Sequence, residues 1–425
     1  MAHNAAAFGF AGAGRRLTLR YNQAISRARE RSAAFWPRHL IVRSSNPVFR
    51  FALFALSALA VAANPLAAQT KSVFSSGLIA PQKIVRTEGG KFVVSESGPG
   101  INQGRVSIVS STGMRSTLLD GLPAGLSGEG EASGPTGVAV DGATLYLAIG
   151  EGDAVRSDSE GAGIPNPAGN ASPIFSSVLR IDFSTDVDNL MSPFVMRPED
   201  QMVLADGYSV ELGNADGATA TVEVLADFPS FIPDPNIPYR PSNPWGVTLS
   251  PRFPGVLFLN DASLDALVRI DTETGRSQRF LHFPKLANPL PFGPPVSDFV
   301  PTSVRAYSRG LLVTRLTGFP FAQGMAAVSF VDVEAREFEP FIGSLTTAVD
   351  VAVQERAGER TRFYTLEFSN DFLQNGPGRL MKYDSPNGEA VVSDLVTPTS
   401  MALDPDTGDI YVTELATGNL IKVVP

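Results

Sequence analysis

Acidic side chains recur at one place in a phrase that the sequence repeats six times. When the copies are aligned, one residue of each falls at the end of the second predicted strand. Five of these residues are acids and one is an arginine: Glu96, Glu151, Asp261, Arg315, Glu367 and Glu414. If the copies surround one axis, these side chains form a ring on one face, near a central channel. Because Ca²⁺ binds about six to eight oxygen ligands, the ring is a candidate calcium site.

The acidic ring supports three interpretations. As a metal site it would draw on four acids: Glu151, Asp261, Glu367 and Glu414. The neighbouring Asn260 and Asn370 would add neutral oxygen donors. As a substrate site it would use a glutamic acid of raised pKa as acid or base, with Arg315 binding an anionic group. As a structural feature, each side chain would simply hydrogen-bond the backbone of a neighbouring repeat.

Other catalytic groups are scarce in this sequence. It has no cysteine, which excludes disulfide scaffolds, thiol nucleophiles and thiolate metal sites. Of its three histidines only His282 lies beyond residue 68, so a site there cannot use two imidazoles. No Gly-x-Ser-x-Gly motif is present. Trp245 begins a predicted strand, where we expect core packing, with ligand stacking as the weaker alternative.

Charge divides the chain into a leader and a body. The net charge of −9 argues against nucleic-acid binding, which needs a basic face. Residues 1–68 are Arg-rich, whereas the remainder is strongly acidic. The uncharged segment 51–63, FALFALSALAVAA, follows Arg50 and precedes Asn64-Pro65 and small residues. This layout predicts a signal peptide over about 43–68 and a secreted or periplasmic protein. The segment is shorter than the roughly 20 residues of a transmembrane helix, so we expect no permanent membrane span.

The repeated phrase predicts the fold. It consists of Pro, a small or polar residue, a short apolar strand, a turn, a second strand ending in an acid, and a third strand. The clearest copies begin at Pro135, Pro244, Pro301 and Pro398, and looser copies begin near residues 81 and 349. A fourth strand follows in segments such as SQRFLHF (277–283). Four-stranded units of this length are the blades of a β-propeller. The sequence therefore predicts an all-β, six-bladed propeller.

The ends of the body predict how the ring closes. The last copy stops after its third strand, and KSVFSSGL (71–78) is placed to supply the missing fourth strand. Closure by the N- and C-terminal strands would remove exposed sheet edges. We expect one domain over 69–425, with long insertion loops at 152–176 and 184–243. Because the repeat leaves 184–243 unassigned, a seventh blade is the alternative.

Several segments resemble the ScyD/ScyE family of secreted propellers. The most specific is LLVTRLTGFPFAQGMAAVSFVD (311–332), and SNPWGVTLSP with FLNDASLDALVRIDTETG (242–275) is also similar. More distantly, the repeat resembles NHL and gluconolactonase-like propellers with six blades. The resemblance implies a secreted six-bladed propeller and does not imply a defined reaction.

Two functional hypotheses follow. The favoured one is a monomeric binding or scaffold protein that holds a small molecule, a glycan or a protein partner on its channel face and long loops. The alternative is a hydrolase or lactonase-like enzyme, with Ca²⁺ in the acidic ring and one Glu as base. Five acids around one axis would repel one another unless a cation or Arg315 compensated them.

Overall fold

The computed structural model describes residues 70–425 except 99, 128–130, 153–154, 158–162, 167–169, 230–241 and 386. The predicted signal peptide, residues 43–68, lies outside the described residues. Within them, no helix is both long and apolar enough to cross a membrane.

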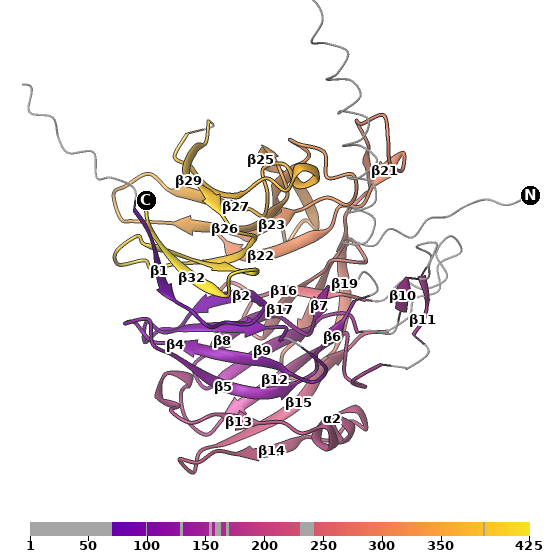
Figure 1. Cartoon of the computed structure of the whole chain (residues 1–425), viewed down its shortest axis with the longest axis vertical. Helices are drawn as coiled ribbons and strands as arrows, with labels where there is room; N and C mark the ends of the chain where they lie inside the picture. The colour runs from indigo at the N-terminus through magenta and orange to yellow at the C-terminus, as the bar shows by residue number, and fades with distance from the viewer. Residues whose placement is uncertain are drawn as a thin grey trace, which may run out of the picture.

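Six sheets of four or five strands surround a central axis and form a six-bladed propeller (Figure 1). The first blade contains, from the axis outwards, β2 (Pro81–Arg86), β3 (Phe92–Glu96), β4 (Gly104–Val109) and β5 (Arg115–Leu122). The second contains β8 (Pro135–Asp141), β9 (Thr144–Ile149), β12 (Ser177–Phe183), β15 (Thr219–Asp227) and β14 (Val210–Gly213). The third contains β16 (Pro244–Leu249), β17 (Val256–Asp261), β18 (Ala266–Asp271) and β19 (Ser277–His282).

The remaining three blades have the same order. The fourth contains β22 (Pro301–Tyr307), β23 (Gly310–Arg315), β24 (Ala326–Asp332) and β25 (Glu337–Leu345). The fifth contains β26 (Ala348–Gln354), β27 (Arg362–Glu367), β28 (Gly378–Tyr383) and β29 (Glu389–Leu395). The sixth contains β30 (Pro398–Leu403), β31 (Ile410–Glu414), β32 (Asn419–Val424) and β1 (Thr70–Ser75).

The ring is closed by its two ends, as the sequence predicts. Strand β1 pairs antiparallel with β32, from Thr70 opposite Val424 to Ser75 opposite Leu420. Figure 1 shows the indigo strand β1 beside the yellow strand β32. The inner strands β2, β8, β16, β22, β26 and β30 each contact the next in a closed circle. Such closure leaves β32 no open edge on which another chain could pair.

The segment 184–243 contains regular structure and is not one long loop. It holds β13 (Phe194–Val195), helix α2 (Pro198–Ala205), β14 and β15. Strand β15 is the fourth strand of the second blade, and β13 pairs with β5 of the first blade. Its described strands extend existing sheets, so the segment forms no seventh blade there. The first residues of β15 alternate between exposed and buried, as a strand with one face in the core does. The search for the repeat overlooked this pattern.

Short elements complete the described structure. Two-stranded hairpins are formed by β6 (Gly125–Leu126) with β7 (Ala132–Ser133), β10 (Val155–Ser157) with β11 (Gly163–Pro165), and β20 (Leu286–Ala287) with β21 (Val296–Ser297). Single 3₁₀ turns occupy η1 (Val187–Asn189) and η2 (Phe372–Gln374). The predicted loop 152–176 therefore contains the β10–β11 hairpin.

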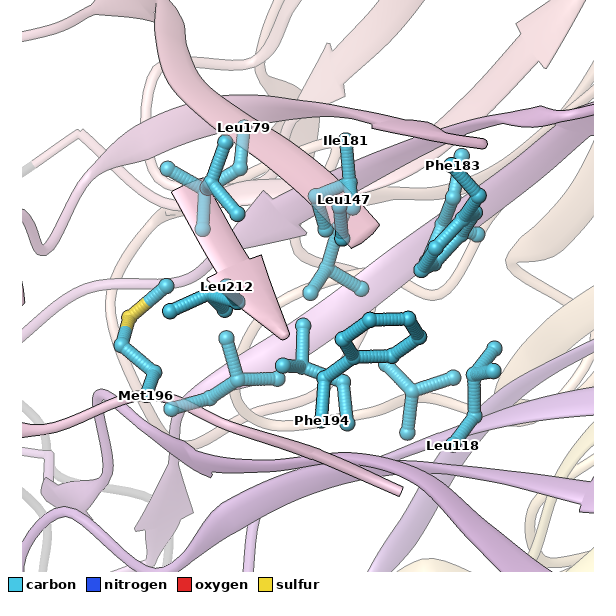
Figure 2. Close-up of a cluster of buried hydrophobic side chains, with 14 of the residues drawn as sticks. Leu118, Leu147, Leu179, Ile181, Phe183, Phe194, Met196 and Leu212 are labelled. Atoms are coloured by element: carbon cyan, nitrogen blue, oxygen red, sulfur yellow. The ribbon is translucent and has the colours of Figure 1, made fainter. Parts of the chain in front are cut away.

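The core lies between the faces of adjacent blades. All residues of β17 are buried, whereas most residues of the outer strand β25 are exposed or half-buried. The largest described cluster joins the first two blades and includes the residues shown in Figure 2: Leu118, Leu147, Leu179, Ile181, Phe183, Phe194, Met196 and Leu212. Phe194 and Met196 come from the 184–243 segment, which therefore adds apolar packing to both blades.

Candidate functional site

The acidic ring occupies one position in the register of five blades. The first residue of each inner strand pairs with the last residue of the second strand in these blades. The pairs are Pro81 with Glu96, Pro244 with Asp261, Pro301 with Arg315, Ala348 with Glu367, and Pro398 with Glu414. The ends of the second strands therefore share one face of the propeller, which we call the channel mouth.

Glu151 does not hold the equivalent position. In the second blade, Pro135 pairs with Ile149, and Glu151 follows two residues later, beyond the end of β9. The alignment that placed Glu151 in the ring was wrong, because it matched the acids rather than the strand register. The Glu151 N–H donates to Oδ1 of Asn243 at 3.1 Å.

Three ring carboxylates accept a backbone N–H from the segment that leads into their own blade. Oε1 of Glu414 accepts the Val396 N–H at 2.8 Å, and Oε1 of Glu367 accepts the Thr346 N–H at 3.1 Å. Glu96 likewise accepts the Ile79 N–H. In each case the bonded residue lies two positions before the inner strand. These bonds are the ones that the structural interpretation of the ring expects.

These bonds hold turns of unfavourable backbone conformation. The residue just before the inner strand is left-handed at Ala80, Val300, Thr347 and Thr397, with φ between 45° and 52°. A β-branched residue is rarely found in this region, because its side chain clashes with the backbone. At Val300 the turn is held by Asp265, whose Oδ1 accepts the Val300 N–H at 2.8 Å. The carboxylates thus fix the chain where it passes from one blade to the next.

Two ring carboxylates are also neutralised by arginines of their own blade. Arg105 pairs with Glu96 at 2.7 Å, and Arg379 donates through Nη2 to Oε1 of Glu367 at 3.1 Å. The hydrogen bond to Glu367 raises the pKa of Arg379. Both glutamates are fully buried. A carboxylate committed to an arginine and a backbone N–H has little capacity left to act as a base or to bind a cation.

Asp261 is buried without a cationic partner in the described structure. Its Oδ1 accepts the N–H groups of Asn243 at 3.0 Å and Leu264 at 3.1 Å, and its Oδ2 accepts the Ser242 hydroxyl. Burial raises the pKa of Asp261, although these hydrogen bonds oppose the rise. The adjacent Asn260 is also fully buried, and its amide has no hydrogen-bond partner among the described residues.

Arg315 is the exception in the ring. Its Nε donates to the Met325 carbonyl at 3.0 Å, and its guanidinium carbon lies 5.2 Å from the centre of the Phe299 ring. Burial lowers its pKa. Arg315 forms no ion pair with any residue that the structure describes.

The other candidate residues are less informative. Asn370 lies in the connection between β27 and η2, where its backbone carbonyl accepts the Gln323 side chain at 3.3 Å. Trp245 is the half-buried second residue of β16. Among the described residues, no three His, Asp or Glu side chains are grouped to hold a metal ion. Calcium binding stays a prediction, for which the described geometry offers no ligand set.

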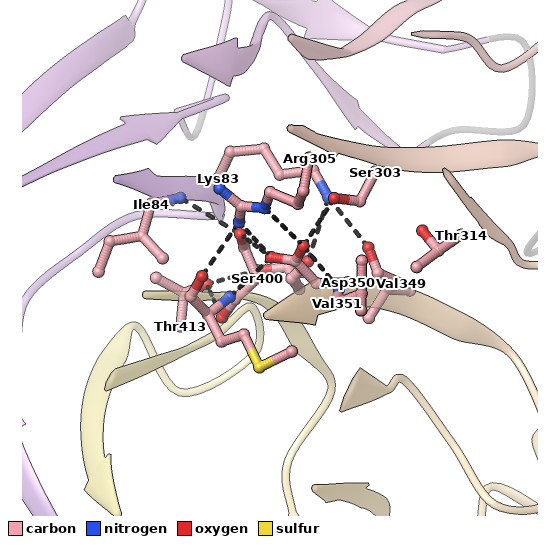
Figure 3. A network of polar contacts seen from close by, with 12 residues as sticks. Lys83, Ile84, Ser303, Arg305, Thr314, Val349, Asp350, Val351, Ser400 and Thr413 are labelled. Atoms are coloured by element: carbon pink, nitrogen blue, oxygen red, sulfur yellow. Dashed lines mark hydrogen bonds and ion pairs between the residues drawn. The ribbon is translucent and has the colours of Figure 1, made fainter. Parts of the chain in front are cut away.

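A polar network that the sequence analysis missed joins inner strands around the channel (Figure 3). It centres on Lys83 of β2, Arg305 of β22 and Asp350 of β26. Lys83 and Asp350 are the third residues of their inner strands, and both are buried. The available signal was a polar third residue in four of the six inner strands: Lys83, Ser303, Asp350 and Ser400.

Comparisons with known proteins show similarity of fold alone. No family model and no curated protein matches the chain. A streptogramin B lyase structure is similar at 12% identity and a TM-score of 0.43, over 84% of this chain and 97% of that one. The soluble aldose sugar dehydrogenase of Escherichia coli, in its apo form, is similar at 13% identity and a TM-score of 0.44, over 84% of this chain and 99% of that one. These neighbours are six-bladed β-propellers. The ScyD/ScyE resemblance therefore rests on its sequence segments.

Proposed function

We propose that the protein is an exported, monomeric binding protein whose channel mouth holds a ligand with an acidic group. The observation that carries this proposal is the half-buried guanidinium of Arg315, which lacks an ion-pair partner among the described residues. It stands where four other blades carry a buried carboxylate. A partly desolvated guanidinium binds a carboxylate or phosphate more strongly than an exposed one does, because water competes less.

Aromatic side chains on the same face supply the rest of the binding surface. They lie in the connections that precede β22 and follow β23 and β27, which all open at the channel mouth. Successive ring centres lie 6.4, 6.2, 4.3 and 6.0 Å apart along an aromatic row: Phe292, Phe319, Phe321, Phe372 and Phe368. Phe292 is 40% exposed, and Phe319, Phe372 and Phe368 are half-buried. Aromatic faces that reach solvent can stack on a flat or sugar ring.

The combined chemistry defines a class of ligand. Arg315 ends β23, and Phe319 of the row follows it by four residues in the sequence. A ring-bearing acid, such as a uronic-acid sugar or an aromatic carboxylate, would place its charge on Arg315 and its ring on the row. The hydrolase hypothesis has less support, because a ring glutamate acting as base would have to release the turn that it holds.

Binding of paired acidic and neutral ligands tests this proposal. The panel contains glucuronate and benzoate, each with its uncharged amide, and affinity is measured by calorimetric titration. We expect the acids to bind better than the amides, and Arg315→Gln to weaken the acids by tenfold or more, about 1.4 kcal/mol. Phe372→Ala should weaken acid and amide alike.

Arg309→Gln is the matched control. Arg309 belongs to the same blade but lies in the β22–β23 turn at the opposite end of these strands, where it pairs with Asp332 at 3.4 Å. This variant should bind like the wild type. Equal affinity for acids and amides, or full acid binding by Arg315→Gln, would contradict the proposal.

A further inference from the structure

The carboxylate of Asp350 is already fully used in the channel network. Its Oδ1 accepts bonds from Ser303 Oγ at 2.6 Å, Arg305 Nε at 3.1 Å and Val351 N at 2.9 Å. Its Oδ2 accepts Arg305 Nη2 at 2.6 Å, Ser400 Oγ at 2.7 Å and Met401 N at 2.9 Å. A carboxylate offers about four lone-pair sites, so Asp350 has no acceptor site left for another cation.

Lys83 therefore lacks a carboxylate of its own. Among the described residues, its Nζ donates to two carbonyl oxygens, of Val349 at 3.2 Å and Thr399 at 3.5 Å, and to no carboxylate. The side chain points into the same network as Arg305 and Asp350 (Figure 3). Lys83 is 5% exposed. Lys83 and Arg305 are cations and Asp350 is the one anion of the network. Among the described residues, the network therefore carries one positive charge in excess.

Burial of this charge is costly to the protein. Desolvation lowers the pKa of Lys83 to about 8, although Asp350 opposes the shift. The group still carries its proton through most of the neutral range. Buried charges in folded proteins are normally paired, since transfer from water without a partner is strongly unfavourable. One further negative charge would therefore be needed to neutralise Lys83 in this network.

A cavity lies beside Lys83 and Arg305. It is bounded by segments of four inner strands: 83–85, Val138, 246–247 and 303–305. It has room for about one water molecule. Gly246 contributes no side chain here, and a Cβ at this position would lie 3.2 Å from Cα of Ser303. The free volume is therefore too small for an organic acid and suits a single small ion.

We infer that this cavity binds a small monovalent inorganic anion of about the size of chloride, held between Lys83 Nζ and the Arg305 guanidinium. The anion neutralises the excess charge and accepts the donors that Asp350 cannot take. The site is distinct from the channel mouth and does not depend on the function proposed there. Its role is to stabilise the ring, because it joins inner strands of the first and fourth blades.

Chloride-dependent unfolding tests the inference. The unfolding midpoint is measured at constant ionic strength while chloride replaces gluconate, an organic anion too large for the cavity. The wild-type midpoint should rise by about 2 °C for each tenfold increase of chloride above its dissociation constant. Lys83→Met should lose this dependence. Lys285→Met should keep it, because Lys285 forms an exposed ion pair with Asp298 at 2.8 Å.

Bromide provides a direct measurement on the wild-type protein, which does not require a variant to fold. Crystals grown in bromide should show an anomalous scattering peak between Lys83 and Arg305. A peak there supports the inference. A cavity without anomalous signal, together with a midpoint that is equal in chloride and gluconate, would overturn it.

Discussion

Arg379 and Glu367 face each other across the β27–β28 pair, and the carboxylate that Arg379 neutralises also accepts the backbone N–H of Thr346. This relationship links the middle of the fifth blade to the turn that enters it. Thr347, the next residue, has a φ of 46°. The ion pair therefore joins β27 to β28 and also helps to hold the unfavourable backbone conformation at Thr347.

A double-mutant cycle on this pair should show strong coupling. We expect Glu367→Gln and Arg379→Gln each to lower the free energy of unfolding by about 2 kcal/mol, because each leaves a partly buried partner unpaired. The double variant should lose less than the sum of the single losses. Urea unfolding measures all three, and additive losses would contradict the role assigned to the pair.

The neighbouring pair Lys382 and Glu389 is the matched control. It joins β28 to β29 in the same blade, but the Glu389 side chain is 59% exposed. Solvent screens such a pair, so Lys382→Gln should change the free energy of unfolding by less than about 1 kcal/mol.

Asp261 should make the wild-type protein relatively less stable as the pH rises. Its pKa is raised by burial, so the folded state keeps the proton at pH values where the unfolded chain has lost it. The stabilisation is full below about pH 3.8 and is lost as the pH rises through the folded pKa. Relative to Asp261→Asn, the wild type should therefore lose stability as the pH rises above about 4, as measured by urea unfolding. A constant difference between the two proteins would show that Asp261 does not titrate in this way.

Lys83 should have its effect in a more alkaline range. Its pKa is lowered to about 8 from the ordinary value of 10.5, with Asp350 and Arg305 as the charged groups acting on it. Between these two values the unfolded chain binds the extra proton, so the stability of the wild type relative to Lys83→Met should rise with pH. The measurement is paired urea unfolding across this range in chloride-free buffer. A difference that falls with pH would have the wrong sign.

The blades could be predicted from sequence because each begins with the same local signals. Pro81, Pro301 and Pro398 open inner strands, where proline is tolerated at the first residue. Alternating apolar residues and turn residues then mark the strands. The missing fourth strand of the last copy also predicted the pairing of β1 with β32. Strand β15 was missed, because α2 and β14 separate it from the rest of its blade.

The candidate site was less predictable, because it depends on register and on contacts between distant strands. Glu151 matched the ring in residue type but lies two residues beyond the paired position. Lys83 donates to carbonyl groups 266 and 316 positions away, and Asp350 accepts bonds from residues about 50 positions away on either side. Sequence spacing does not indicate which carbonyl or carboxylate such a side chain will meet. The bonds of the ring acids to the inter-blade turns could be seen only in the structure.

Removal of the six-residue strand β1 should greatly lower the stability of the whole propeller, because β1 closes the ring. A protein beginning at residue 76 would lack the fourth strand of the sixth blade and expose the edge of β32. We expect it to aggregate or to unfold at a clearly lower temperature. A protein beginning at residue 69, which retains β1, is the control. Similar midpoints and monomeric elution for both would contradict closure by this strand.

We propose that the ring carboxylates serve to hold the turns between blades rather than to bind calcium. The most direct test is thermal unfolding of the wild type and Glu367→Gln, each with Ca²⁺ and with a chelator. A metal bound by the native state must raise the midpoint. We predict the same wild-type midpoint in both conditions, and a lower midpoint for Glu367→Gln that is also independent of calcium. A calcium-dependent rise in the wild type that Glu367→Gln abolishes would contradict the claim.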